Sequence, residues 1–211
     1  MQSNRETGIR PSRNYFLLAW SAFVAAALWQ LAPASSTTVL EMNTEEMTAR
    51  ADLILRGRVL SSESLWDDSR TKIFTEYLLE VEECFKGVPG ETRKVSVRQW
   101  GGVVGDRGYY IPGVATFAPN EDVFAFFTSP NPRSGTRFTV GLSQGKYSVL
   151  DEESSGKELL RRNLRGLTYY DAISDRSYEP EPEEAPVYYD DIRTEVRNYL
   201  GQGHESTEES K

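Results

Sequence analysis

The most regular pattern in the chain lies between Ile73 and Phe85, where apolar and polar side chains alternate without a Gly or Pro. Alternation with a period of two predicts a half-buried strand. A helix is the alternative, because leucine and glutamate are good helix formers. We favour the strand because its β-branched and aromatic residues fall on the alternating positions. At about 3.3 Å per residue this strand is unusually long, so we expect a bend or bulge in it.

Shorter patterns of the same kind predict further strands around this one. Gly57 marks the expected position of a bulge or sharp bend in the first of them. Residues 122–128 are apolar on both faces and predict a central strand. Residues 137–142 and 146–150 predict a closing hairpin that turns over residues 143–145, with Gly145 at positive φ. The full set of expected additional strands is 51–60, 93–100, 109–111, 122–128, 137–142 and 146–150.

Helices are expected at both ends of this β region. Asn43, followed three residues later by Glu46, has the capping-box arrangement and predicts a short helix through about Arg50. Its apolar residues, which we expect to pack on the strands, are Met42, Met47 and Ala51.

The character of the sequence changes after Leu150. Residues 151–173 predict an amphipathic helix, because four leucines form a stripe with three arginines facing outward. Residues 174–186 hold three Pro and five acidic side chains, which is typical of an extended linker. A short amphipathic helix is expected over residues 187–200, followed by a disordered tail over 201–211. The predicted architecture is therefore a mainly β protein: a small antiparallel barrel of OB or netrin-like type, with five or six strands within residues 35–150, flanking short helices and an acidic carboxy-terminal extension.

Residues 1–34 have the pattern of a signal peptide. Basic residues precede an apolar run from Tyr15 to Trp29, and small residues follow at Ala32 and Ala34. We expect cleavage after Ala34 and a mature chain that begins at Ser35 and is exported, either to the periplasm or as a secreted protein. An uncleaved amino-terminal membrane anchor is the alternative. The run is shorter than the roughly 20 apolar residues of a spanning helix, which favours cleavage.

The charge distribution and the cysteine content argue against a nucleic-acid partner and against an intramolecular disulfide. Residues 35–150 carry 15 acidic and 13 basic side chains, whereas residues 151–211 carry 16 and 8, within a chain of net charge −8. Nucleic acid is not expected as a partner, because binding to phosphate backbones needs clustered basic residues. Cys84 is the only cysteine, so no intramolecular disulfide is possible, and we interpret it as a partly buried structural thiol.

The motifs with known chemistry are incomplete. Residues 141–145 fit the G-x-S-x-G pattern of a hydrolase nucleophile elbow, but strand follows strand there and the only histidine, His204, lies in the expected tail. We therefore expect no catalytic role for Ser143. The glycines at 101, 102 and 105 are followed by aromatic residues and Pro rather than by a helix that would bind phosphate. The sequence has no spacing typical of a metal site, and we expect no cofactor.

Aromatic residues in or beside the predicted loops are the remaining candidates for a binding surface. Packing beneath long loops is the alternative explanation for them, but Trp and Tyr are also favoured at ligand and partner surfaces. These candidates are Trp66, Trp100, Tyr109, Tyr110 and Phe117.

Four stretches, at residues 51–59, 85–87, 101–102 and 140–147, make the domain similar to a group of uncharacterised exported bacterial proteins. The order of elements also resembles the OB-type barrel of netrin-like modules, which include tissue inhibitors of metalloproteases. Those inhibitors act through an amino-terminal cysteine held by disulfides, whereas this chain has Ser35 at its expected mature terminus. The resemblance implies the barrel fold and, as one possible role, the regulation of a protease.

These observations favour a non-catalytic binding or interaction module outside the cytoplasm. We expect its partner to be an extracytoplasmic protein or a glycan, and we expect membrane contact only through an uncleaved amino-terminal segment. A protease regulator or inhibitor of netrin-like type is the second hypothesis. A hydrolase that uses two carboxylates is the third, because the spacing of such carboxylates is set by the fold.

Overall fold

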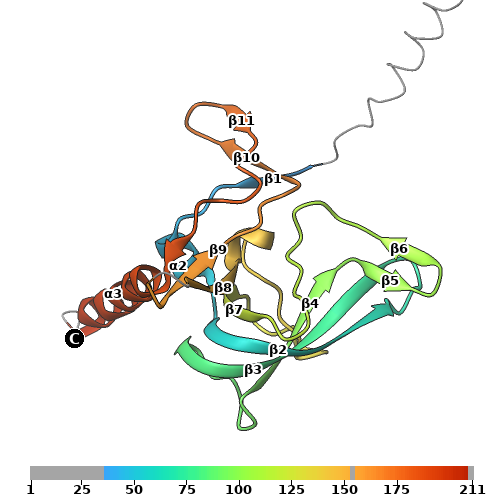
Figure 1. Ribbon diagram of the computed structural model, residues 1–211, viewed down its shortest axis with the longest axis horizontal. Coiled ribbons are helices and arrows are strands. Elements are labelled where there is room, and N and C mark those ends of the chain that lie inside the picture. Colours follow the sequence, from blue (N-terminus) through green and yellow to red (C-terminus); the bar gives the residue numbers. More distant parts are fainter. Residues whose placement is uncertain (1–35, 153–154, 209–211) are drawn as a thin grey trace, which may run out of the picture. The chain divides into compact units, whose positions relative to one another are not determined.

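The structure is a computed structural model that describes residues 36–152 and 155–208. The predicted signal peptide, residues 1–34, lies outside the described residues. Within the described part, no helix is both long enough and apolar enough to cross a membrane. The described part of the chain consists mainly of strands, together with one short and one long α-helix (Figure 1). In chain order they are β1 (Thr37–Leu40), α2 (Thr44–Arg50), β2 (Leu53–Trp66), β3 (Ile73–Lys86), β4 (Lys94–Trp100), β5 (Gly102–Val104), β6 (Arg107–Tyr109), β7 (Asp122–Phe127), the short 3-10 helix η1 (Leu142–Gly145), β8 (Lys146–Glu152), β9 (Lys157–Arg161), β10 (Leu167–Asp171), β11 (Arg176–Tyr178), β12 (Val187–Tyr188) and α3 (Tyr189–Glu208).

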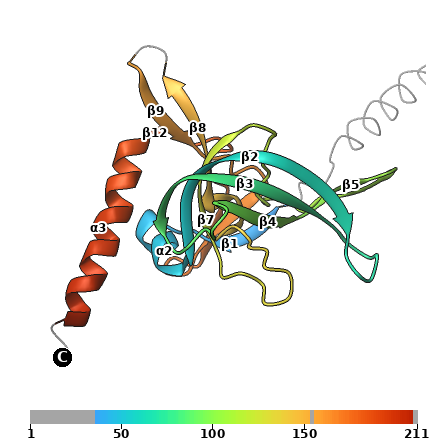
Figure 2. The same ribbon diagram turned by 90° about the horizontal axis from the view of Figure 1, so that it is seen from below.

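A curled antiparallel sheet with strand order β12-β9-β8-β7-β2-β3-β4 forms the main body. The long predicted strand is confirmed as β3, and Figure 2 shows it curving together with β2. The pairing register shifts between Arg56 and Gly57, which confirms the predicted bulge. A Cβ atom at Gly57 would lie 2.2 Å from the carbonyl oxygen of Glu80, so only glycine lets the two backbones approach there. Strand β2 continues to Trp66, six residues beyond its predicted end, because residues 61–66 pair with the first half of β3.

The central strand β7 separates two apolar clusters, as the two-sided hydrophobicity of residues 122–128 predicts. Val123, Ala125 and Phe127 point to one side and pack with β2, β3, β4 and the loop that precedes β7. Phe124 and Phe126 point to the other side and pack with α2 and α3. The capping box of Asn43 and Glu46 is present, and the Met42, Met47 and Ala51 side chains are buried, as expected.

The predicted strand over residues 146–150 is confirmed as part of β8, but residues 137–142 form no strand paired with it, so the predicted closing hairpin is wrong. Residues 137–139 instead make short bridges to two strands, from Arg137 to Val97 in β4 and from Thr139 to Phe127 in β7. Strand β8 pairs with β7 and β9. The turn that leads from residues 137–141 into β8 is η1. The positive φ values at this turn belong to Gly141 (64°) and Leu142 (61°) rather than to Gly145.

The predicted amphipathic helix over residues 151–173 is also wrong, because this segment forms β9 and β10. Leu159 and Leu160 pair with Leu150 and Val149 across the β8–β9 hairpin, where Leu160 is fully buried and the other three are half-buried. Strand β10 lies between β1 and β11 in a second, three-stranded sheet (Figure 1).

The carboxy-terminal segments follow the prediction only in part. Residues 174–186 include strand β11, so they are not wholly an extended linker. The predicted helix over residues 187–200 begins instead at Tyr189, after the short strand β12. It then continues as α3 through Glu208, into the segment predicted as a disordered tail; residues 209–211 lie outside the described residues.

The turn between β2 and β3 is expected to lose stability in acid through Asp67. Its carboxylate accepts hydrogen bonds from the backbone N–H groups of Lys72 (3.0 Å) and Thr71 (2.7 Å) and from the hydroxyl of Ser69 (2.6 Å). The bond from Lys72, followed by those from Ser69 and Thr71, lowers the pKa of Asp67 from 3.8 to about 2. Because the folded-state pKa is the lower one, this contribution is complete above about pH 4 and is lost as the pH falls towards 2. An NMR titration of the Asp67 carboxyl carbon measures this shift, and a midpoint near 3.8 would contradict it.

Candidate functional site

A cavity of about 370 Å³ opens where the loop before β7, strand β8 and the chain after β9 come together. We call it the basic pocket, because four cationic side chains and two carboxylates line it in a chain whose net charge is −8. Its lining comprises Tyr110, Gly113, Val114, Ala115, Thr116, Ala118, Glu121, Ser143, Lys146, Ser148, Arg161, Arg162, Asn163, Arg165 and Glu183.

Strand alternation on β8 places Lys146 and Ser148 on the pocket side and buries Tyr147 on the opposite side, with α3. The ammonium group of Lys146 forms an ion pair with Glu121 and donates a hydrogen bond to the Ser148 hydroxyl (2.9 Å). Ser148 in turn donates to Glu121 Oε1 (2.6 Å), and Glu121 Oε2 accepts from the backbone N–H of Ala118 (2.7 Å). These contacts fix Lys146 and Glu121 in defined positions.

Burial lowers the pKa of Lys146 from its ordinary value, and the charge of Glu121 counteracts part of this effect. An ammonium group has three N–H donors, and Glu121 and Ser148 accept two of them. The third donor has no hydrogen-bond partner among the described residues. The Ser148 hydroxyl both accepts from Lys146 and donates to Glu121, so it has no free proton and is poorly suited to act as a nucleophile.

Ser143 contributes a buried polar group without a partner. Its side chain is 6% exposed, and its Oγ atom has no hydrogen bond among the described residues although it lines the basic pocket. The turn that carries it is held by Gln144, whose amide donates to the carbonyl of Leu40 (3.0 Å) and accepts from the N–H of Met42 (2.9 Å). A buried hydroxyl left unpaired has a free-energy cost, and a ligand atom within reach would remove that cost.

The end of β9 and the chain after it supply three arginines to the pocket lining. Arg161 and Arg165 flank the carboxylate of Glu183, with nitrogen to oxygen distances of 3.9 and 3.6 Å. Arg162 is buried more deeply and forms a short ion pair with Glu184 (2.5 Å) beside the Tyr147 ring. Arg162 is therefore neutralised, whereas Arg161 and Arg165 share one distant carboxylate.

The nucleophile elbow suggested by G-x-S-x-G is not formed. Residues 141–145 make a 3-10 turn that leads into β8, and a nucleophile elbow requires a turn from a strand into an α-helix. The side chain of His204, the only histidine in the sequence, is not among the described ones. Ser143 thus lies in the pocket without an identified base.

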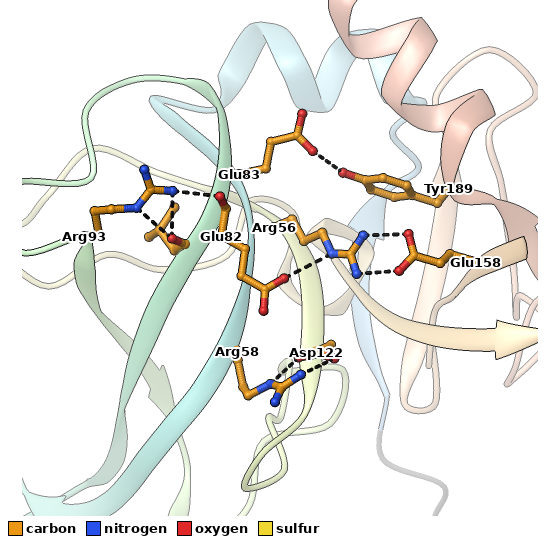
Figure 3. Close-up of polar contacts among 9 residues, drawn as sticks. Arg56, Arg58, Glu82, Glu83, Arg93, Asp122, Glu158 and Tyr189 are labelled. Carbon is orange, nitrogen blue, oxygen red and sulfur yellow. Dashed lines mark hydrogen bonds and ion pairs between the residues drawn. The ribbon is translucent and has the colours of Figure 1, made fainter.

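A second group of charged side chains, around Arg56 and Arg58 of β2, pairs with other side chains of the protein (Figure 3). Arg56 makes a bidentate ion pair with Glu158 (2.5 and 2.6 Å), and Arg58 makes one with Asp122 (2.7 and 2.9 Å). Glu83 accepts from the Tyr189 hydroxyl (2.8 Å), which helps to attach α3 to the sheet. Because these charges neutralise one another, we assign this group a structural role.

Two further cavities have fewer polar groups that are free to bind a ligand. One of about 460 Å³ is acidic, with Asp151, Asp190 and Asp191 in its lining, and its Glu158 already pairs with Arg56. Among the described residues, no three His, Cys, Asp or Glu side chains are placed to hold a metal ion. An apolar cavity of about 360 Å³ beside β1 carries Arg50 as its one charged group.

The five aromatic candidates do not form one surface. Trp66, Trp100 and Tyr109 lie towards the far end of the β2–β3 hairpin, where Trp100 stacks on Phe138 at 6.2 Å between ring centroids. Tyr110 is 77% exposed and lines the basic pocket. Phe117 is buried in the core against Tyr77 and Phe127, so it is not a surface residue as predicted. Its ring lies 5.6 Å below the Lys146 ammonium group.

Sequence reasoning did not identify the charged residues of the basic pocket. Arg161, Arg162 and Arg165 were assigned to the outer face of a helix, and Glu121 and Lys146 were not singled out. One sequence feature does point to them: three arginines occur within five residues of an otherwise acidic extension. A lysine at the inward position of a strand rich in apolar residues is a second such feature.

Comparison with protein-family models, with curated proteins and with solved structures finds no match for this chain. The chemistry of the basic pocket is therefore the guide to its function.

Proposed function

We propose that the protein is a non-catalytic binding module that holds an anionic ligand in the basic pocket. The observation that carries this proposal is the buried hydroxyl of Ser143, which has no partner among the described residues and lies in a lining where cationic side chains outnumber carboxylates by four to two. The third donor of Lys146, which has no partner among the described residues, and the exposed side chains of Arg161 and Arg165 can supply further contacts for an anion.

Binding is better supported than catalysis because the polar groups of the pocket lack an activated nucleophile. Ser148 is engaged on both sides, and Ser143 has no base within hydrogen-bond distance among the described residues. The lowered pKa of Lys146 would suit a general base, but its contact with Glu121 favours the protonated form. A protonated lysine binds anions and does not accept a proton.

The OB or netrin-like barrel remains part of this proposal. The bridges from residues 137–139 to both β4 and β7 support it, because they link strands on the two sides of the curled sheet. We also propose that the module acts outside the cytoplasm, on the basis of the signal-peptide pattern in residues 1–34. An extracytoplasmic protein or a glycan would then present the anionic group.

Replacing Ser143 by alanine separates a binding role from a structural one. Without ligand, Ser143→Ala should leave the free energy of unfolding unchanged or slightly higher, because it removes an unsatisfied buried hydroxyl. Binding of an anionic probe should weaken about tenfold, since hydrogen bonds to charged groups contribute about 1.5–3 kcal/mol. Isothermal titration calorimetry with phosphate, sulfate and tri-galacturonic acid, together with urea unfolding, measures both quantities.

Two arginine variants complete this experiment. Arg165→Ala should weaken the binding of the same probes, and Arg133→Ala, an exposed arginine outside the pocket lining, should not. If none of the three anions binds the unaltered protein, or if Arg133→Ala weakens binding as much as Arg165→Ala does, the basic pocket is not the binding site.

A further inference from the structure

Glu183 occupies the mouth of the basic pocket as a weakly held carboxylate. Its two oxygens lie 3.6 Å from Arg165 Nη2 and 3.9 Å from Arg161 Nη1, beyond hydrogen-bond distance in both cases. All three side chains are about half exposed or more, with exposed fractions of 45% for Arg161, 49% for Glu183 and 69% for Arg165. Exposed ion pairs of this kind contribute little to stability. Another anion can therefore replace Glu183 beside the two guanidinium groups at a small cost in free energy.

The backbone that carries Glu183 is fixed independently of that side chain. The carbonyl of Pro182 accepts a hydrogen bond from the N–H of Leu164 (2.9 Å), and a β-bridge joins Glu183 to Asn163. The next residue, Glu184, is tied to the buried Arg162. The Glu183 side chain can therefore turn away from the two arginines while the acidic segment stays in place.

We propose that the ligand is an acidic saccharide whose carboxylate takes the place of Glu183 between Arg161 and Arg165. This inference rests on the proposed binding function and names its ligand class. The protein's own group at this position is a carboxylate, and the fork of a guanidinium matches the planar geometry of a carboxylate. The two carboxylates in the lining, Glu121 and Glu183, limit the net positive charge of the pocket and so favour a singly charged group over a doubly charged one such as phosphate.

The remaining lining residues are suited to bind the hydroxyl groups of a sugar. Ser143 Oγ, the Lys146 ammonium group and the Asn163 amide line the same pocket as the arginine pair and are polar groups that can bind hydroxyls. Tyr110, which is largely exposed at the same pocket, offers an aromatic face for the apolar side of a sugar ring. A volume of about 370 Å³ is at the lower end of the range for small-ligand pockets and accommodates one or two sugar units.

The test compares two glutamines introduced into the same acidic segment. Glu183→Gln removes the competing carboxylate and should tighten the binding of tri-galacturonic acid about two- to fivefold, the range expected for an exposed ion pair. Glu181→Gln is the matched control, because Glu181 is exposed and makes no ion pair with the described residues, and it should leave the affinity unchanged. Neutral galactotriose should bind the unaltered protein at least tenfold more weakly than tri-galacturonic acid.

The outcomes distinguish this inference from the proposed function. An unchanged or weaker affinity in Glu183→Gln would overturn the displacement of Glu183 while the pocket remained a binding site for anions. Equal binding of galactotriose would show that the charge of the ligand is not recognised, and would overturn the proposed function as well. Binding of phosphate or of a glutamate-rich peptide without binding of tri-galacturonic acid would overturn the saccharide assignment alone. If no anionic probe binds, the proposed function itself fails, and this inference fails with it.

Discussion

Truncating Phe124 to alanine is expected to destabilise the protein by about 3–5 kcal/mol, as is typical for a large aromatic side chain removed from a core. Phe124 is fully buried on the central strand β7. Its ring lies 5.4 Å from the centroids of Phe85 and Phe126, 6.2 Å from that of Tyr147 and 5.9 Å from that of Tyr189 on α3. The variant therefore leaves a cavity at the point where the sheet meets α3. Urea unfolding, with an unchanged slope against denaturant, measures the loss.

Phe138→Ala is the control for this substitution. Phe138 is only half buried and stacks on Trp100 at the end of β4, so its truncation should cost clearly less. Equal losses for the two variants, or a loss below about 1 kcal/mol for Phe124→Ala, would show that the aromatic cluster does not anchor α3.

Local sequence patterns were sufficient to predict the strands that bury one face or both faces. Alternation identified β3, the run of apolar residues identified β7 as central, and Gly57 identified the bulge in β2. The capping box around Asn43 was equally informative, because both of its hydrogen bonds form within four residues. In each case the interaction that decides the structure lies within the segment itself.

The segment after Leu150 was predicted wrongly because its structure depends on distant residues. Leucines at 159, 160, 164 and 167 fit a helical stripe, but β8 offers unpaired backbone groups next to Leu159 and Leu160. Gly156 and Gly166 adopt positive φ values of 67° and 80°, which a continuous helix does not allow. Pairing with β8 outweighed helix propensity, as tertiary contacts often do.

The basic pocket could not be predicted for the same reason. Glu121 precedes β7, Lys146 begins β8, Arg161 ends β9 and Arg165 follows it, so 44 residues of sequence separate the first and last of these groups. Only strand pairing brings them together. The arginines were interpreted as the outer face of a helix. That interpretation left out the pairing of β9 with β8, which brings them close to Lys146.

Replacing Glu121 by glutamine is expected to be the most damaging change within the pocket. The Lys146 and Glu121 side chains are only 11% and 17% exposed, so the variant leaves a buried ammonium group without its counter-charge. Breaking a buried ion pair by removing one partner typically costs about 3–5 kcal/mol. Replacing both residues, as in Glu121→Gln with Lys146→Met, should recover most of this loss because no buried charge then remains.

The loss in Glu121→Gln should also depend on pH in a defined direction. Burial already holds the folded-state pKa of Lys146 below its ordinary value of 10.5, and removal of Glu121 lowers it further. Between the folded-state pKa and the unfolded-state pKa, the unfolded chain binds more protons, so stability increases as the pH rises through this interval. Urea unfolding of the single variants and the double variant between pH 7 and 10 should show the steepest rise for Glu121→Gln and none from this site once Lys146 is replaced. A loss below about 1 kcal/mol with the pH dependence of the unaltered protein would mean that Glu121 does not neutralise a buried Lys146.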